Sequence, residues 1–320
     1  MTTELHKNGK LLLSGEYAVL DGALSLAMPT QYGQNFGIVG DVHSEILLWR
    51  ALDHRNELWF EAKINIQHST IRSTNNPELA GSLKTILDAA LQLNPAFKKI
   101  AQGAQVTSRL EFPRSWGLGS SSTLIAAIAQ WSQTDAFVLS ALSFGGSGYD
   151  VAAADRSAPF TYQVDKPKPI INTVSLDWPF TGNLYFVHRN QKQNSRDSIA
   201  HYRKKKKSQS WIQEISAITQ AMIHTSSTYE FASLIRQHEQ MIATSLGLTP
   251  VQEELFKDFA GAVKSLGGWG GDFVMALAPD SDFAGSPRSK GSNISNYTTN
   301  YFKEKGFDTI IPFDEMMLQH

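Results

Sequence analysis

The sequence predicts a mixed α+β protein built from two lobes. Short runs of alternating apolar and polar residues fill the first third of the chain, as in segments 10–20 and 58–66. This period is typical of antiparallel strands and hairpins. Apolar residues at helical spacing dominate the second half, and 320 residues exceed the roughly 150 of an average domain. We therefore expect a β-rich lobe followed by a mixed lobe.

The first lobe is expected to cover residues 1–165. After its strands, apolar residues recur at helical spacing over 78–93, and the strand-like segment 104–112 leads through Pro113 into a glycine-rich loop. Proline-punctuated β runs then indicate a boundary near 165–180.

The second lobe is expected to cover residues 166–320. Its periodicity predicts helices near 195–225, 228–246 and 251–261. A glycine-rich stretch, a short helix and the strand 308–313 follow.

Composition limits the classes of partner. The 29 basic and 30 acidic residues leave a net charge of −1, so no global field attracts nucleic acid or an anionic membrane. The chain has no cysteine, which excludes disulfides and cysteine-based zinc sites. The start lacks the apolar core of a signal peptide. A membrane span requires about 18 consecutive apolar residues, and the sequence contains no such run. We expect a cytoplasmic monomer or homodimer whose partner is a small-molecule substrate.

The segment WGLGSSST, residues 116–123, suggests an anion site. A glycine turn that opens into a helix presents unpaired backbone N–H groups and the positive end of the helix dipole, which attract phosphate. A serine-capped helix after an ordinary turn explains the segment equally well. Glycine stands beside charged or hydroxyl residues in three further segments, 8–22, 145–150 and 266–273, and each alone is a common turn.

Taken in order, these four segments resemble the GHMP kinase superfamily over nearly the whole chain, and they look closest to the mevalonate and phosphomevalonate kinases. The resemblance implies an N-terminal ribosomal-protein-like lobe with a left-handed βαβ unit and a C-terminal ferredoxin-like lobe. It also implies transfer of a phosphoryl group from ATP, with Mg²⁺, to a small acceptor.

The nucleotide loop is the most specific part of this resemblance. The family pattern P-x-x-x-G-L-G-S-S is matched by Pro113, Gly117, Leu118, Gly119, Ser120, Ser121, Ser122 and Thr123, counting the small residues that follow. The resemblance implies that the loop cradles the ATP phosphates and that the Ser121 hydroxyl reaches Mg²⁺. No G-K-[ST] follows, so this is not a Walker loop.

Two residues match the family's catalytic positions. By resemblance, Lys10 activates the acceptor hydroxyl or neutralises the transferred phosphoryl group; a strand lysine that extends into solvent is the alternative. Asp150 in SGYD matches the aspartate base, with Ser147 as a substrate contact, although aspartate also commonly caps a helix. Glu16 and Tyr17 would shape the substrate pocket.

The chain departs from the family pattern at two positions. The C-terminal glycine loop of the family is matched by Gly267, Gly268, Gly270, Gly271 and Asp272. Trp269 stands where glycine is usual, and its bulk would narrow the acceptor pocket. Leu139 replaces the glutamate that usually binds Mg²⁺, so metal binding would depend on Ser121, the phosphates, water and Asp150.

The resemblance to mevalonate-pathway members also implies that the acceptor lies beside segment 184–199, where a strand is expected to lead into a polar loop and helix. Candidate contacts are Lys192, Asn194, Ser195 and Arg196. A helix start capped by Asn194 or Ser195 explains them equally well. The lysine-rich run 203–207 is expected to be a solvated loop or helix end, although Lys192, Arg196 or this run could hold a phosphate already on the acceptor.

The predicted function is transfer of the γ-phosphoryl group of ATP to mevalonate or phosphomevalonate. A diphosphomevalonate decarboxylase would share the fold and the ATP loop. A catalytically silent nucleotide-binding protein is suggested by Leu139 and Trp269. A serine hydrolase is disfavoured, because Tyr149 stands where the nucleophile elbow needs its last glycine.

Overall fold

The structure is a computed structural model that describes residues 2–41, 44–165, 167–191, 195–269, 271–279 and 294–318, with only the backbone at 195–197 and 294–295. The chain divides into two units. The first unit comprises Met1–Lys10, Tyr32–Arg114 and Leu118–Arg156, and the second comprises Leu11–Gln31, Ser115–Gly117 and Ser157–His320. Two long strands, β1 (Thr2–Ser14) and β2 (Ser25–Gly40), belong to both units, because the division falls within each of them.

The first unit contains a sheet of strand order β5-β4-β3-β6-β2, with β1 paired to β2. Its further strands are β3 (Ile46–Leu52), β4 (Leu58–Asn65), β5 (Thr70–Thr74) and β6 (Ala104–Leu110). The pairs β3–β4 and β4–β5 are antiparallel, as the alternating pattern predicts, whereas β3 and β6 are parallel. A parallel pair needs a crossover, and two helices, α1 (Pro77–Leu93) and α2 (Phe97–Ala101), lie in the connection to β6.

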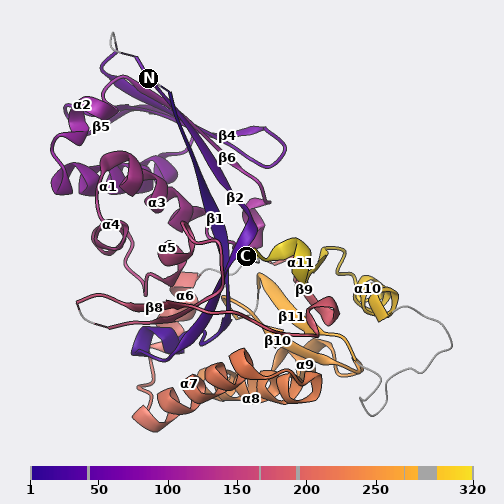
Figure 1. The fold of residues 1–320 in the computed structure, drawn as a ribbon. Helices are drawn as coiled ribbons and strands as arrows, with labels where there is room; N and C mark the ends of the chain where they lie inside the picture. Colours follow the sequence, from indigo (N-terminus) through magenta and orange to yellow (C-terminus); the bar gives the residue numbers. More distant parts are fainter. Residues whose placement is uncertain are drawn as a thin grey trace. The chain divides into compact units, whose positions relative to one another are not determined.

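Helices cover one face of this sheet (Figure 1). They are α1, α3 (Ser120–Ser132), α4 (Ala136–Ser143) and α5 (Tyr149–Ala153). Apolar side chains of strands and helices meet in a single core that includes Trp49, Phe60, Ile86 and Ile128. The helix predicted over 78–93 is confirmed as α1, which begins after Asn76 because the side chain of Asn76 accepts the Leu79 N–H.

The second unit contains the N-terminal part of β2 with the hairpin β7 (Phe160–Gln163) and β8 (Ile170–Thr173), and a separate antiparallel sheet of order β10-β11-β9-β12. The strands of that sheet are β9 (Leu184–His188), β10 (Ala262–Ser265), β11 (Phe273–Leu277) and β12 (Ile310–Pro312). Helices α6 (Ser195–Tyr202), α7 (Gln209–His224), α8 (Thr228–Leu246) and α9 (Val251–Leu255) separate β9 from β10, and α10 (Ile294–Glu304) separates β11 from β12. This βαββαβ order, with the first and third strands in the centre, is the ferredoxin-like arrangement.

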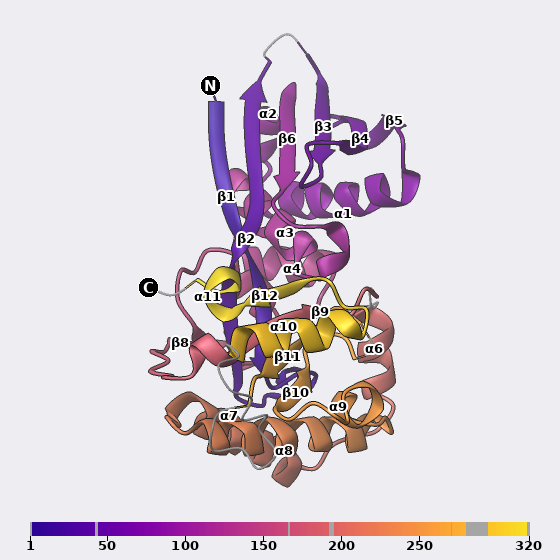
Figure 2. The same ribbon diagram turned by 90° about the vertical axis from the view of Figure 1, so that its right-hand side faces the viewer.

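Figure 2 shows α7 and α8 side by side beneath β10, and α8 packs against that strand. Short helices complete the unit, namely η1 (Ala18–Asp21), η2 (Arg114–Trp116), η3 (Thr181–Asn183) and α11 (Phe313–Met316). Among the described residues, none of the helices combines the length and the apolarity that a membrane crossing requires.

Two predicted helices differ from the structure. The segment 195–225 forms two helices, because the basic side chains of residues 203–206 are exposed in the connection and Ser208 caps a new helix by accepting the Trp211 N–H. The prediction of a solvated basic loop is thereby confirmed for residues 203–206, whereas Lys207 is half-buried, with its Nζ 4.4 Å from the centre of the Tyr202 ring. The segment 251–261 is helical only to Leu255, where Phe256 and Phe259 turn into an apolar cluster with Phe302.

Candidate active site

The predicted nucleotide loop, residues 117–123, runs into α3 through a glycine in the left-handed region. Gly119 precedes the helix with φ 93°, and no side chain among the residues that the structure describes caps this N-terminus. The serine-capped alternative is therefore wrong for α3. The first N–H groups of an uncapped helix have no partner within the helix, and the helix dipole adds positive potential there. The arrangement is suited to binding an anion.

The four hydroxyl residues of the loop divide into two pairs. Ser122 is buried and donates to the Gly119 carbonyl at 2.8 Å, while buried Thr123 donates to Gln34 Oε1 at 2.6 Å. Ser120 is half-buried and Ser121 is exposed, and within the described residues their hydroxyls have no hydrogen-bond partner. The second pair is thus available to a ligand.

Lys10 lies directly over the loop. Its backbone N–H donates to the Leu118 carbonyl at 3.0 Å, which joins β1 to the loop. Its Cε and Cγ lie 3.2 and 3.3 Å from the position that a β-carbon at residue 119 would take. Its Nζ lies 5.8 Å from the centre of the Tyr149 ring. The first unit therefore brings together Lys10, the loop and the start of α5.

Asp150 lies in the first turn of α5, next to Tyr149. The N-cap of this helix is Gly148, with φ 88° and no side-chain cap, so Asp150 is not the capping residue. Its Oδ1 accepts the N–H of Val151 at 3.0 Å, and its side chain is half-buried. Ser147 and Pro113 are also half-buried.

Leu139 is a core residue of α4 with no exposed surface. A carboxylate there would lie among apolar side chains, so this position does not present a metal ligand. Within the described residues, no group of three or more histidine, aspartate or glutamate side chains could hold a metal ion. The donors that remain at the loop, Ser120 and Ser121, fit Mg²⁺ bound largely by phosphate and water.

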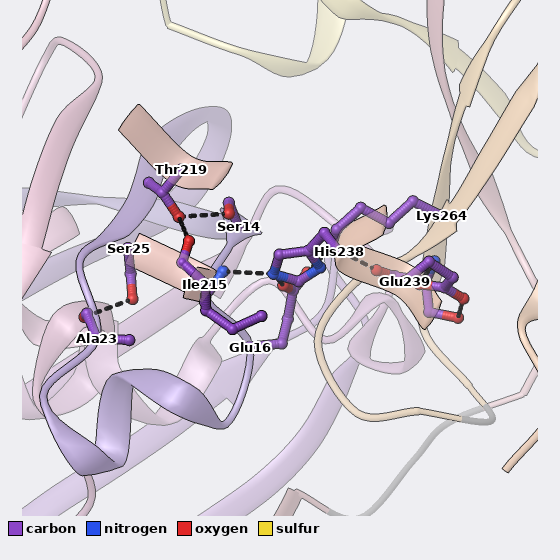
Figure 3. A network of polar contacts seen from close by, with 11 residues as sticks. Ser14, Glu16, Ala23, Ser25, Ile215, Thr219, His238, Glu239 and Lys264 are labelled. Carbon is purple, nitrogen blue, oxygen red and sulfur yellow. Dashed lines mark hydrogen bonds and ion pairs between the residues drawn. The ribbon is translucent and has the colours of Figure 1, made fainter. Parts of the chain in front are cut away.

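In the second unit, the turn 15–17 is held by buried side chains from two other elements (Figure 3). The carboxylate of Glu16 forms an ion pair with Lys264 of β10, and both side chains are buried. His238 of α8 accepts the Gly15 N–H at Nε2, at 2.9 Å, which places the ring proton of a neutral imidazole on Nδ1. Glu16 Oε2 lies 3.3 Å from the same nitrogen.

Burial sets the protonation of these groups. It raises the pKa of Glu16, an effect that Lys264 opposes. Burial, together with the charge of Lys264, holds the pKa of His238 well below 6.5. Burial raises the pKa of Glu239 to about 7, against Lys264 and hydrogen bonds from Val251 and Ser265. At neutral pH the imidazole is therefore uncharged, and Glu239 is close to its midpoint.

Tyr17 contacts the C-terminal glycine loop. Its hydroxyl accepts the backbone N–H of Trp269 at 2.9 Å. The indole of Trp269 is 6% exposed and packs in an apolar cluster with Tyr17, Tyr202 and Ile242. The bulky residue of the loop is thus a core side chain of the second unit.

Asp272 closes the same loop; it belongs to the family match at this loop, but no separate role is predicted for it from the sequence. Its φ is 53°, and its carboxylate atoms lie 2.6 to 2.8 Å from where a β-carbon at Gly117 would be. Its N–H donates to the Gln191 carbonyl, and its carbonyl accepts the N–H of Arg189, both at 2.8 Å. The only sequence signal was a charged residue that directly follows the glycines.

The remaining predicted positions vary in how far the structure describes them. Lys192, Asn194 and Gly270 lie outside the described residues. Ser195 begins α6, but the side chains of Ser195 and Arg196 are not described. Gly267 is half-buried, while Gly268 and Gly271 are buried and joined by a hydrogen bond from Gly271 N to Gly268 O.

Several solved structures share this fold over nearly their whole length. No model of a protein family and no curated protein sequence matches the chain. The Lin0012 protein from Listeria innocua matches with a TM-score of 0.69 at 16% identity, over 98% of this chain and 97% of that one. The phosphomevalonate kinase of Streptococcus pneumoniae, in complex with phosphomevalonate and AMPPNP, matches with 0.68 at 15% identity, over 95% and 97%. The mevalonate kinase of Methanococcus jannaschii matches with 0.66 at 15% identity, over 97% of each chain. The protein has the fold of the GHMP kinases, the superfamily that the order of its glycine-rich segments resembles.

Proposed function

We propose that this protein is an ATP-dependent kinase that phosphorylates mevalonate or phosphomevalonate. The observation that carries the proposal is the N-terminus of α3, where the part of the chain that the structure describes supplies no side-chain cap and no partner for the hydroxyls of Ser120 and Ser121, and where the Lys10 side chain lies across Gly119. Backbone N–H groups and a cation would there face the phosphates of a nucleotide.

The candidate site residues of the first unit have separate tasks in this proposal. The N–H groups after Gly119 bind the phosphates. Lys10 neutralises charge on the transferred phosphoryl group, and Asp150 accepts the proton of the acceptor hydroxyl as its oxygen attacks phosphorus. The new P–O bond forms as the bond to the leaving ADP oxygen breaks. Positioning and charge carry most of the catalysis in such transfers.

Mg²⁺ would enter with the nucleotide and neutralise phosphate charge, with Ser121 as its ligand from the protein. Since Leu139 is a core residue and offers no ligand, we propose Asp150 as the carboxylate that would lie beside the Mg²⁺ ion. We propose that the acceptor is bound by the polar segment that begins α6 and by the C-terminal glycine loop.

The test is release of ADP by purified protein with Mg²⁺-ATP and, separately, mevalonate, phosphomevalonate, diphosphomevalonate, homoserine and galactose. Turnover with one acceptor identifies the substrate, and Asp150→Asn is expected to lower kcat by about 10²-fold or more while ATP still binds. Release of CO₂ from diphosphomevalonate would identify a decarboxylase instead. ATP binding without turnover of any acceptor would overturn the kinase proposal and favour a silent nucleotide-binding protein.

A further inference from the structure

Lys264 is a buried cation in a strand that is otherwise uncharged. Its side chain is 1% exposed, and its Nζ contacts the Glu16 carboxylate and donates to the Ser265 carbonyl at 2.9 Å. Removing an ammonium group from water is costly unless it is paired and hydrogen-bonded. Both conditions are met here. Of the two partners of Lys264, Ser265 is the next residue in the sequence, whereas Glu16 lies 248 positions away.

Ser265 is the last residue of β10, where the chain leaves the strand for the glycine loop. Its N–H donates to Glu239 Oε2 at 3.1 Å, and its hydroxyl donates to Glu239 Oε1 at 2.9 Å. Its carbonyl accepts from Lys264. Every polar group of Ser265 is therefore bonded to a buried ionisable side chain. The next residue, Leu266, donates its N–H to Phe273 O at 3.0 Å, which closes the base of the loop.

The turn 15–17 reaches the loop at a second point. Glu16 contacts the base of the loop through Lys264, and Tyr17 accepts the N–H of Trp269 further along. The turn is itself fixed by His238, which accepts the Gly15 N–H. The loop is thus held at its base and within its length by the same three-residue turn.

We propose that Lys264 is a positioning residue, whose buried pair with Glu16 fixes the C-terminal glycine loop against the turn 15–17 in the conformation that acts on substrate. Its effect on catalysis rests on the proposed kinase function; its effect on the loop does not. Replacing a buried ion pair by apolar groups of similar volume often leaves stability unchanged or higher. The role proposed for this pair is therefore the geometry that it imposes on the loop, rather than a gain in stability.

The test compares Lys264→Met, Glu16→Gln and the double variant with the wild type. Amide hydrogen exchange of the peptide covering 266–272 reports the loop, and chemical denaturation reports global stability. Each single variant leaves one buried charged partner alone and is expected to be destabilised. The double variant is expected to regain most of the stability, yet to exchange its loop amides about tenfold faster and to lose about tenfold in kcat, with KM for ATP within about twofold.

Lys7→Met is the matched control, because Lys7 is also buried and paired with a carboxylate, that of Asp155, in the first unit. It is expected to lower stability without raising exchange in 266–272. If the double variant had the same loop exchange and the same kcat as the wild type, the inference would be overturned and the pair would be merely structural. If Lys264→Met does not fold, the double variant and Glu16→Gln decide the question. Absence of turnover in the wild type would contradict the proposed function, whereas loop exchange would still decide the role of Lys264.

Discussion

At position 119 the space that a β-carbon would take is already filled by two side chains. The Ser122 hydroxyl lies 2.7 Å from that point, and two carbons of Lys10 lie within 3.3 Å. The residue also has a φ of 93°, which favours glycine. Steric fit and backbone conformation therefore both require glycine, and the same contact holds Lys10 over the loop.

Gly119→Ala is accordingly expected to destabilise the protein by more than about 2 kcal/mol and to abolish ATP binding, since Lys10 must move. Gly247→Ala is the control, because Gly247 has φ 71° but nothing within 4 Å of the added carbon. It is expected to cost only about 1 kcal/mol of backbone strain and to bind ATP normally. Urea denaturation and nucleotide titration measure both. Equal effects of the two changes would contradict the steric argument.

Position 139 offers a second test at this scale. Leu139→Glu places a carboxylate in the core of the first unit and is expected to destabilise by more than about 4 kcal/mol, with no gain in Mg²⁺ affinity. Leu139→Met keeps the volume and should cost less than about 1.5 kcal/mol. A stable Leu139→Glu variant that bound Mg²⁺ more tightly would show that the position faces the ligand.

Two adjacent serines in the first turn of α3 have different environments, so we expect one to affect ligand binding and the other to affect stability. Ser122 is buried and bonded to Gly119, whereas the Ser121 hydroxyl is exposed. The two serines are adjacent and chemically identical, so their environments alone distinguish them.

Ser122→Ala is expected to lose about 1 kcal/mol of stability through its hydrogen bond. Ser121→Ala should leave stability within about 0.5 kcal/mol but lower kcat with Mg²⁺-ATP by about tenfold or more. Thermal unfolding and steady-state kinetics measure the two effects. An unchanged kcat in Ser121→Ala would remove this serine from the proposed Mg²⁺ site.

Periodicity predicted those elements whose apolar faces are continuous. The helix expected over 228–246 is α8 with the same bounds, because Ser227 caps its start and Gly247 ends it. The resemblance predicts that residues 117–123 bind nucleotide, from a signal that is local in sequence; this role stays a prediction. The group around Lys264 left little signal, since its members come from β1, α8 and β10 and only packing brings them together. The available signal in the sequence was Lys264 itself, a single lysine within an apolar strand.

At the scale of the whole molecule, buried ionisable groups should make stability depend on pH. The fold raises the pKa of Glu239 to about 7 from 4.5 and so favours its neutral form. The stabilising contribution of Glu239 to the free energy of unfolding is fully present below pH 4.5 and is lost as pH rises through about 7. His238, whose pKa is lowered, acts oppositely and loses its contribution as pH falls below 6.5.

Glu239→Gln isolates the first effect, because His238 is present in both proteins. Between pH 4.5 and about 7.5, the free energy of unfolding of the wild type should fall relative to the variant by about 3 kcal/mol. Urea denaturation across this range measures the difference. A difference independent of pH would mean that Glu239 ionises as in an unfolded chain.

The passage of β1 and β2 through both units means that the units are not modules that a gene could gain or lose separately. The chain enters and leaves each unit repeatedly, so no single cut of the gene yields either one whole. A fragment beginning at residue 157 would keep Lys264 without Glu16, and one ending at residue 156 would keep β2 without β7. Recombination with relatives should therefore yield folded chimaeras only when the crossovers keep residues 11–31, 115–117 and 157–320 from the same parent.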